Sequence, residues 1–169
     1  MSPVREIELR RRKIDAIFER ANNLAGQPNS EILQADFARY ICVLVSGFVE
    51  KATAELILYY AQDKAAIPIR TYIDTNLRRL TNVDKERLLQ VIGSLDASWR
   101  NDVDDFVIDE KKAALNSIVG LRHNIAHGGD GGISLGQIAR YWASIQQIIE
   151  HLENLLLNNP RAIKAAKKK

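Results

Sequence analysis

The sequence predicts an all-α protein, an up-and-down bundle of five to six helices. Apolar residues recur at helical spacing almost everywhere, and no stretch alternates with the period of two that marks a half-buried strand. With 169 residues, 46% of them hydrophobic and 27% charged, the chain has the size and composition of one globular domain. We therefore expect a single helical domain over residues 1–158 and a basic, flexible tail over 159–169.

The first helix is expected over residues 4–24, because its apolar side chains recur at helical spacing. These are Val4, Ile7, Ile14, Ile17, Phe18, Ala21 and Leu24. The run AGQPNS (25–30) ends this helix, and Ser30 is placed to cap the next one, over 31–62. That second helix is apolar on nearly every face, which predicts a position in the middle of the bundle.

Two short helices are expected next, over residues 69–79 and 83–94. Thr81 and Asp84, in the run TNVD, are candidate caps for the second of them. The acidic run DASWRNDVDDFVIDE (96–110) is expected to be a connector.

The chain then ends in two longer helices, expected over residues 111–127 and 134–157 and separated by the loop GGDGG (128–132). The last helix has one apolar stripe, which includes Tyr141 and Trp142. We expect this stripe to be a packing face with no cofactor implied. Because both aromatic residues belong to it, no platform for stacking nucleic-acid bases is predicted.

The net charge of +3 comes from the expected tail. Arg161 and the four lysines after it supply +5, so residues 1–158 carry −2. Such a tail could hold a nucleic-acid backbone through its phosphates, or be a solvated chain end.

Location and redox state follow from what the sequence lacks. No apolar run approaches the roughly 20 residues of a membrane span, and the N-terminus has no apolar core of a signal peptide. We expect a soluble, cytoplasmic protein with no membrane partner. Cys42, the single cysteine, is expected to be a small core residue.

The stretch LRHNIAHGG (121–129) holds two of the three histidines, near the expected end of a helix. At about 100° per residue, this helix separates into two sides. The core side contains Ala114, Ile118, Leu121 and Ile125. The other side carries a polar stripe of Asn116, Gly120, His123 and His127, bordered by Asn124. Glycine in the stripe lets another backbone or a ligand come close, so the stripe is a candidate site, with Asn116 in a supporting role.

Two charged or titratable residues of this helix need partners. His127 ends the helix if Gly128 follows its C-terminus, and the helix dipole there favours a cationic imidazole. Arg122 lies near the edge of the core side, where a guanidinium needs a carboxylate, a phosphate or solvent. Glu50, on an otherwise apolar face of the second helix, is the candidate supporting partner; the alternative is an exposed Glu50 bonded to Lys51 or water.

The histidine pair has two interpretations besides catalysis. Each histidine could be an ordinary surface residue. Histidines four residues apart can also share a metal ion on one helix face. However, His151 is expected to project away from the packing stripe of the last helix, and Asp130 is the only nearby carboxylate. Further ligands are therefore missing, and no metal is predicted.

Arg122 and His127 form the pattern R-x4-H near the end of a penultimate long helix, followed by glycine, in a small all-α bundle. In these features the chain resembles the HEPN family. Residues 30–157 are similar to stand-alone prokaryotic HEPN proteins related to the RiboL-PSP and MAE-type groups. The resemblance implies a metal-independent endoribonuclease that acts as a homodimer, with two R-x4-H motifs in one cleft. Such proteins are often toxins of toxin–antitoxin pairs or parts of anti-phage systems.

The resemblance makes Arg122 and His127 the catalytic pair, with Asn124 or His123 as the polar residue beside them. Family members often have asparagine or aspartate straight after the arginine, whereas this chain has histidine there, so the choice between the two stays open. The expected partner is RNA, with no cofactor. A cognate antitoxin or a nucleotidyltransferase is a further possible partner, because related domains can also be catalytically silent binding or dimerisation modules. The loop glycines either give RNA room to approach or serve a helix end and a tight turn.

Overall fold

Helix α2 (Ser30–Gln62) is the longest element of the computed structural model, which describes residues 3–62, 64–129 and 131–158. The other helices are α1 (Pro3–Asn22), α3 (Ile67–Leu77), α4 (Lys85–Gly93), α5 (Ala97–Phe106), α6 (Asp109–Ala126) and α7 (Leu135–Leu157). The described residues contain no strand, so the predicted all-α class is confirmed, with seven helices instead of five to six.

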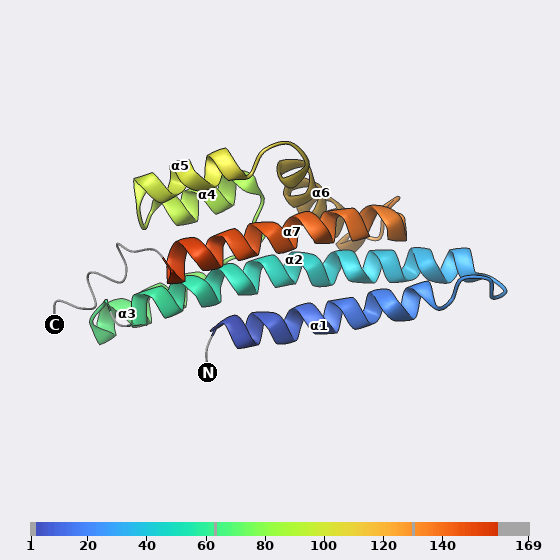
Figure 1. Ribbon diagram of the computed structural model, residues 1–169, viewed down its shortest axis with the longest axis horizontal. Helices are drawn as coiled ribbons and strands as arrows, with labels where there is room; N and C mark the ends of the chain where they lie inside the picture. The colour runs from blue at the N-terminus through green and yellow to red at the C-terminus, as the bar shows by residue number, and fades with distance from the viewer. Residues whose placement is uncertain (1–2, 63, 130, 159–169) are drawn as a thin grey trace.

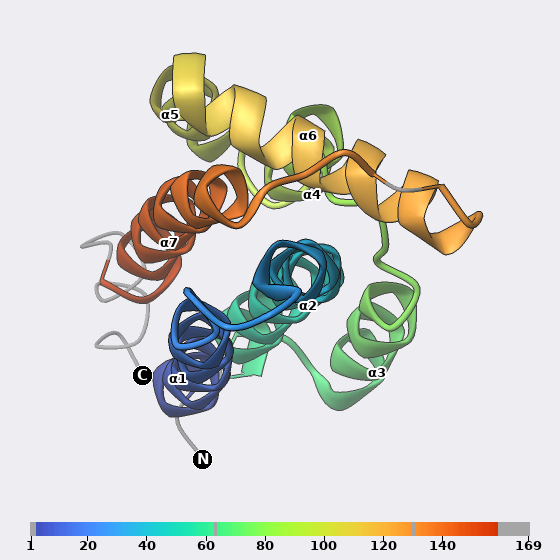
Figure 2. The same ribbon diagram turned by 90° about the vertical axis from the view of Figure 1, so that its right-hand side faces the viewer.

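The long helices α1, α2 and α7 lie side by side with their axes nearly aligned (Figure 1). Seen along these axes, α1, α7, α6 and α3 surround α2 (Figure 2). Residues on more than one face of α2 are buried, including Ile41 on one side and Ile57 and Ala61 on another. The central position predicted for this helix is confirmed by its contacts with α1, α3, α6 and α7, although its side chains Tyr40, Val43 and Tyr59 are exposed.

Neighbouring long helices do not simply alternate in direction. Helices α1 and α2 run antiparallel, whereas α7 runs in the same direction as α2 (Figure 1). Helix α6 crosses them steeply, so it is seen nearly end-on in Figure 1 and from the side in Figure 2. Because of this crossing, the C-terminal end of α6 extends past α2 and α7.

Helix α5 lies within the acidic run 96–110, where the sequence predicted only a connector; that prediction is wrong. Asp96 caps the helix, its carboxylate accepting hydrogen bonds from the backbone N–H groups of Ser98 (2.7 Å) and Trp99 (3.3 Å). Trp99 and Val103, one turn apart, are buried, and the acidic side chains lie around the outside. Two buried residues are too few to show a helical period in so acidic a run.

Several other helix ends follow their capping residues. Asp84 caps α4 by accepting from the N–H of Arg87 at 2.8 Å, and of the two candidates it is Asp84, not Thr81, that forms the cap. Helix α7, expected from residue 134, begins at Leu135 and is capped by Ser134, whose hydroxyl accepts from the N–H of Gln137. Helix α3 begins two residues earlier than expected because Pro68 occupies its first turn, where the missing N–H costs nothing.

His151 is not among the buried residues of the α7 stripe and lies against α5. Its Nε2 is 2.5 Å from Oδ1 of Asp102, and its ring stacks on Phe106 with the centroids 4.0 Å apart.

The core extends from α1 to α7. Cys42 is fully buried, as predicted, with its sulfur 3.8 Å from the carbonyl oxygen of Ile118, and burial raises its pKa to about 11. On α1, Ile7 and Ile14 are buried, but Val4, expected on the same face, is 44% exposed. Over the described residues, no helix combines the length and apolar character needed to cross a membrane. The basic run predicted to form a tail, 159–169, lies outside the described residues.

Candidate functional site

The end of α6 places His127 at the surface. Helix α6 stops at Ala126, His127 is its C-cap, and Gly128 follows with φ +82°. The N–H of Gly128 donates to the carbonyl of Ile125 at 3.1 Å. A residue with left-handed backbone angles ends a helix in this way, and glycine adopts these angles easily because it has no Cβ to clash. Gly128 is therefore the terminating glycine that the sequence predicts.

The two sides of α6 are those expected from helical periodicity. Ala114, Leu115 and Ile118 are buried. Asn116, Gly120, His123 and His127 are exposed. The polar stripe is thus a surface of the chain, and a Cβ added at Gly120 would meet no atom within 4 Å. The stripe can accept a ligand or another chain without a change in the packing of α6.

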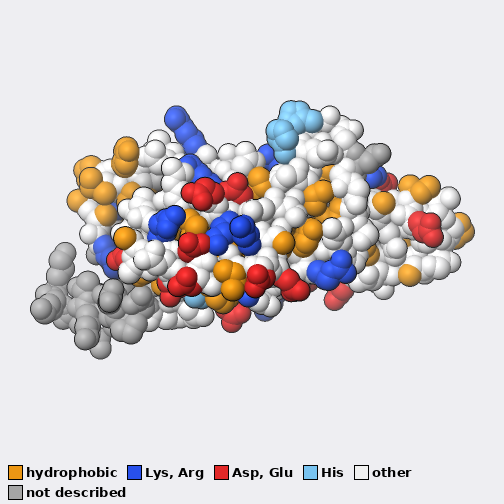
Figure 3. All heavy atoms as spheres, turned by 90° about the horizontal axis from the view of Figure 1, so that it is seen from above, with side chains coloured by type: hydrophobic (Ala, Val, Ile, Leu, Met, Phe, Trp, Pro, Cys, Tyr) orange, Lys and Arg blue, Asp and Glu red, His pale blue; other side chains and the backbone are white. Residues whose placement is uncertain are grey.

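The imidazoles of His123 and His127 contact each other. Their ring centroids are 4.4 Å apart, and the ring planes meet at 62°. Both side chains are exposed, and histidine side chains form a protruding patch at the edge of the face seen in Figure 3. Two proton-transfer groups therefore lie together on the solvent side of the helix end.

Arg122 points away from the histidines, toward the loop between α3 and α4. Its Nη1 lies 3.4 Å from the side-chain oxygen of Asn82. The carboxylate of Glu50 accepts a hydrogen bond from the backbone N–H of the same Asn82 at 2.8 Å. The direct ion pair predicted between Glu50 and Arg122 is not among the ion pairs of the described residues; both side chains reach Asn82 instead.

Asn82 is the site residue that sequence reasoning missed. Its φ is +52°, in the left-handed region that asparagine tolerates better than most residues. This backbone lets its N–H face Glu50 while its side chain faces Arg122. The run TNVD carried a signal for a turn, but nothing in it pointed to a helix 40 residues further along the chain.

The two asparagines of α6 have partners within the chain. The side-chain oxygen of Asn116 accepts from the N–H of Lys85, the first residue of α4, at 3.0 Å. That of Asn124 accepts from the N–H of Gly131 at 3.2 Å, and its carbonyl accepts from Gly129. Asn116 thus holds α4 against α6, and Asn124 shapes the loop after the histidines. Both are placed to support the site by positioning its surroundings.

A metal site would need more ligands than the histidine pair. No group of three or more histidine, cysteine, aspartate or glutamate side chains is arranged to hold a metal ion among the described residues. His151 is engaged with Asp102, and Asp130 lies outside those residues.

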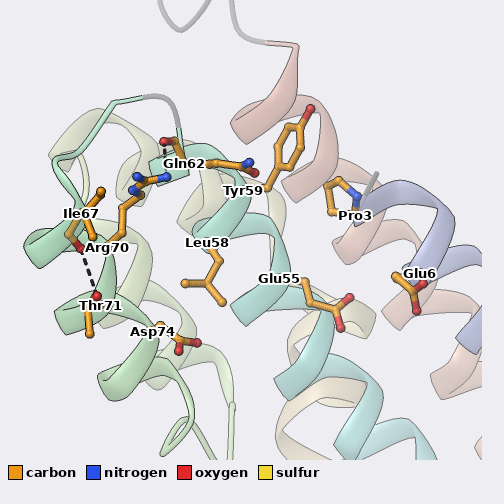
Figure 4. Close-up of a pocket in the computed structure, with 10 residues that line it drawn as sticks. All are labelled: Pro3, Glu6, Glu55, Leu58, Tyr59, Gln62, Ile67, Arg70, Thr71 and Asp74. Carbon is orange, nitrogen blue, oxygen red and sulfur yellow. Dashed lines mark hydrogen bonds between the residues drawn. The ribbon is translucent and has the colours of Figure 1, made fainter. Parts of the chain in front are cut away.

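A pocket of about 560 Å³ lies elsewhere on the molecule, between α1, α2 and α3. Figure 4 shows acidic, basic and apolar side chains around it. Three of its charged groups already have partners: Glu55 pairs with Arg10, Arg70 donates to the carbonyl of Gln62, and Asp74 pairs with Arg78. None of the motif residues lines it, so we do not place the site there.

The chain carries a HEPN domain, a class of all-α domain that agrees with the helical fold described above. More particularly, the chain belongs to the RiboL-PSP-HEPN family, whose model matches residues 5–158. The match includes α1, so it covers more of the chain than the span 30–157 that carries the resemblance. Comparison with curated proteins and with solved structures gave no significant match.

Proposed function

We propose that this protein is a metal-independent endoribonuclease. RNA carries its own nucleophile, since the 2′-OH can attack the adjacent phosphorus and release the 5′-oxygen. The reaction needs a base for the 2′-OH proton, an acid for the leaving oxygen, and positive charge near the phosphoryl oxygens. The observation that carries the proposal is the exposed, touching pair of imidazoles at the end of α6, within two helical turns of an arginine.

Each motif residue has a role in this chemistry. His127 exchanges the proton, and His123, whose ring touches it, supports it. Arg122 binds the phosphate with its forked donors, held in direction by Asn82. Asn124 keeps the loop beside the histidines in place. Glu50 and Asn116 do not contact the substrate in this scheme. Glu50 holds the backbone of Asn82, and Asn116 holds the start of α4.

A homodimer supplies what one chain lacks. Within one chain, Arg122 points toward Asn82, while His127 lies on the polar stripe about 140° around the helix. One copy therefore offers poor geometry for holding a single phosphate. Two polar stripes related by a two-fold axis bring the two His127 side chains together, so that one serves as base and the other as acid, with one Arg122 to the side of each.

The biological role that fits such an enzyme is that of a toxin of a toxin–antitoxin pair or an anti-phage effector. This part of the proposal rests on family analogy. Expression of the protein is expected to arrest growth, and His127→Ala is expected to relieve the arrest. A folded His127→Ala protein that arrests growth as strongly as the parent would contradict the role.

The direct test is incubation of the purified protein with an RNA oligonucleotide and with DNA of the same sequence, each with and without EDTA. We expect the RNA alone to be cut, equally in both buffers, with 2′,3′-cyclic phosphate ends seen by mass spectrometry. Downstream fragments with 5′-phosphates, or activity lost in EDTA and restored by zinc, would overturn the mechanism. No cleavage under any condition would favour a silent binding module.

A further inference from the structure

A second cavity lies directly beside the motif, between α6, the loop after it and α7. Its volume is about 430 Å³. Its walls include Ser117, Gly120 and Asn124 from α6, Gly131 from the loop, and Gln137 and Tyr141 from α7. This size is within the range of small-molecule sites.

Gly120 belongs both to this cavity and to the polar stripe that carries the histidines. Because a Cβ there would meet no atom within 4 Å, no side chain from elsewhere in the described part of the chain covers Gly120, where the cavity and the stripe adjoin. Asn124, between His123 and the loop, also lines the cavity. A ligand held at the histidines can therefore extend a neighbouring group into it.

The chemistry of the cavity selects a neutral, polar ligand group. None of its described lining residues carries a charge, so it offers a phosphate no cation to pair with. It offers one hydroxyl, two amides and a phenol. We propose that this cavity receives the base of the nucleotide next to the scissile phosphate, and so gives the enzyme a base preference. The proposal rests on the proposed action on RNA.

The hydrogen bonds within the cavity leave specific groups for a base edge. The amide nitrogen of Gln137 donates to the hydroxyl of Tyr141 at 2.9 Å, which leaves the Gln137 oxygen as an acceptor and the Tyr141 O–H as a donor. The Asn124 oxygen accepts from Gly131, which leaves its NH₂ group to donate. Donors and an acceptor at fixed positions are what distinguishes one unstacked base from another.

Tyr141 also supplies an aromatic wall, which the sequence did not predict. It was expected on the packing stripe with Trp142. Trp142 is indeed buried, at 4% exposure, but Tyr141 is only half-buried and lines the cavity. The edge of the packing stripe therefore runs between Tyr141 and Trp142. Stacking on a tyrosine is a common way to hold a single-stranded base.

The test measures binding, so that it does not depend on cleavage. His127→Ala protein is titrated into four fluorescein-labelled RNA hexamers, A6, C6, G6 and U6, and anisotropy gives four Kd values. We expect one hexamer to bind about tenfold more tightly than the weakest. Adding Tyr141→Phe, Gln137→Ala or Ser117→Ala should reduce that ratio by about three- to tenfold, since each removes one hydrogen-bonding group.

The control is Tyr72→Phe, on an exposed tyrosine of α3 that should leave the ratio unchanged. Equal affinity for all hexamers, or a ratio that none of the three cavity variants changes, would overturn the proposal. The two proposals fail separately. A base preference that depends on Tyr141 in a protein that never cleaves RNA would refute only the ribonuclease. If the protein cleaves RNA but none of these variants changes its base preference, only the base site is refuted.

Discussion

Arg122 and Asn82 meet across 40 residues of sequence, the arginine donating to a neutral side-chain oxygen at 3.4 Å. Among the described residues Arg122 forms no ion pair, so none of their carboxylates neutralises its charge. Glu50, the predicted partner, bonds to the backbone of Asn82 instead. An amide that directs a guanidinium without neutralising it leaves the cation available to a phosphate. Asn82 is therefore a positioning residue for Arg122.

Replacing Asn82 by glycine should impair the site and spare the fold. Glycine keeps the left-handed backbone, φ +52°, and the N–H that bonds to Glu50, and removes only the acceptor for Arg122. We expect an RNA cleavage rate lower by about tenfold, equivalent to about 1.4 kcal/mol, with a nearly unchanged melting temperature. Rates from a fluorogenic RNA and thermal melts by circular dichroism check this.

Asn82→Asp tests whether the charge of Arg122 is used to bind the substrate phosphate. It retains an acceptor for Arg122 but adds a carboxylate, which competes with the phosphate for the guanidinium. We expect KM for RNA to rise more than in Asn82→Gly, and more strongly at low ionic strength, where charge interactions are least screened. An Asn82→Asp protein as active as the parent would show that the charge of Arg122 is not used on substrate.

The two histidines should differ in their effects although their rings touch. His127 is the proposed proton-transfer group, so His127→Ala should lower the cleavage rate by about 10²- to 10⁴-fold. His123→Ala should cost less, because it removes only a neighbour at 4.4 Å. Both side chains are exposed, so both variants should fold normally. Single-turnover rates beside circular dichroism spectra distinguish these outcomes, and the reverse order would exchange the two roles.

Asn116 should matter more for stability than for chemistry. Its oxygen accepts from the N–H of Lys85 in the first turn of α4, where helix donors have no partner of their own. Asn116→Ala should cost about 0.5–2 kcal/mol of unfolding free energy, as loss of a cap does. Asn116→Asp keeps the acceptor and suits the helix dipole, so it should restore stability. Urea unfolding measures both; a stable Asn116→Ala with no cleavage would place Asn116 in catalysis.

The parts of the site that were predictable from sequence depend on one helix alone. The polar stripe with His123 and His127 follows from 3.6 residues per turn, and the end of α6 follows from a glycine directly after the last turn. Such local rules need no knowledge of the neighbours. The central position of α2 was equally predictable, because a helix with apolar residues on most faces buries the larger part of them against its neighbours.

The parts that were not predictable depend on how distant segments pack. Asn82 lies in the loop just before α4, and Asn116 holds the start of α4 against α6. This packing brings Asn82 within reach of Arg122. Tyr141 lines a cavity only because the stripe of α7 ends beside it. The expected ion pair between Glu50 and Arg122 does not form, although both side chains bond to the same residue, Asn82. Helical periodicity predicts the face on which a side chain lies but not the group that it contacts.

Cys42 should make the protein less stable in alkali. Burial raises its pKa from 9.0 to about 11, so above pH 9 the unfolded chain loses this proton while the folded chain keeps it. The folded state then binds more protons, and stability falls as pH rises. Between pH 9 and 11 the loss attributable to this thiol is about 2–3 kcal/mol. Urea unfolding of the parent and of Cys42→Ala across this range should give a shallower decline for the variant.

Gly120 tests whether the polar stripe is where two chains meet. Within one chain, a side chain at this position would point into open space, so Gly120→Leu should not disturb the monomer and should even favour the helix. In a dimer with facing stripes, the same leucine would hold the helices apart. We expect Gly120→Leu to weaken dimerisation and RNA cleavage together, whereas His127→Ala should remove cleavage and keep the dimer.

Gly47 provides the matched control for this prediction. It lies in α2, and a Cβ there also meets no atom within 4 Å, but it is remote from the stripe in sequence and lines a different pocket, between α1 and α2. Gly47→Ala and Gly120→Ala add the same atom to two helices, and only the second should affect association. Analytical ultracentrifugation beside a cleavage assay compares them with Gly120→Leu. A monomeric Gly120→Leu protein that cleaves RNA at the parental rate would show that one chain holds a complete site.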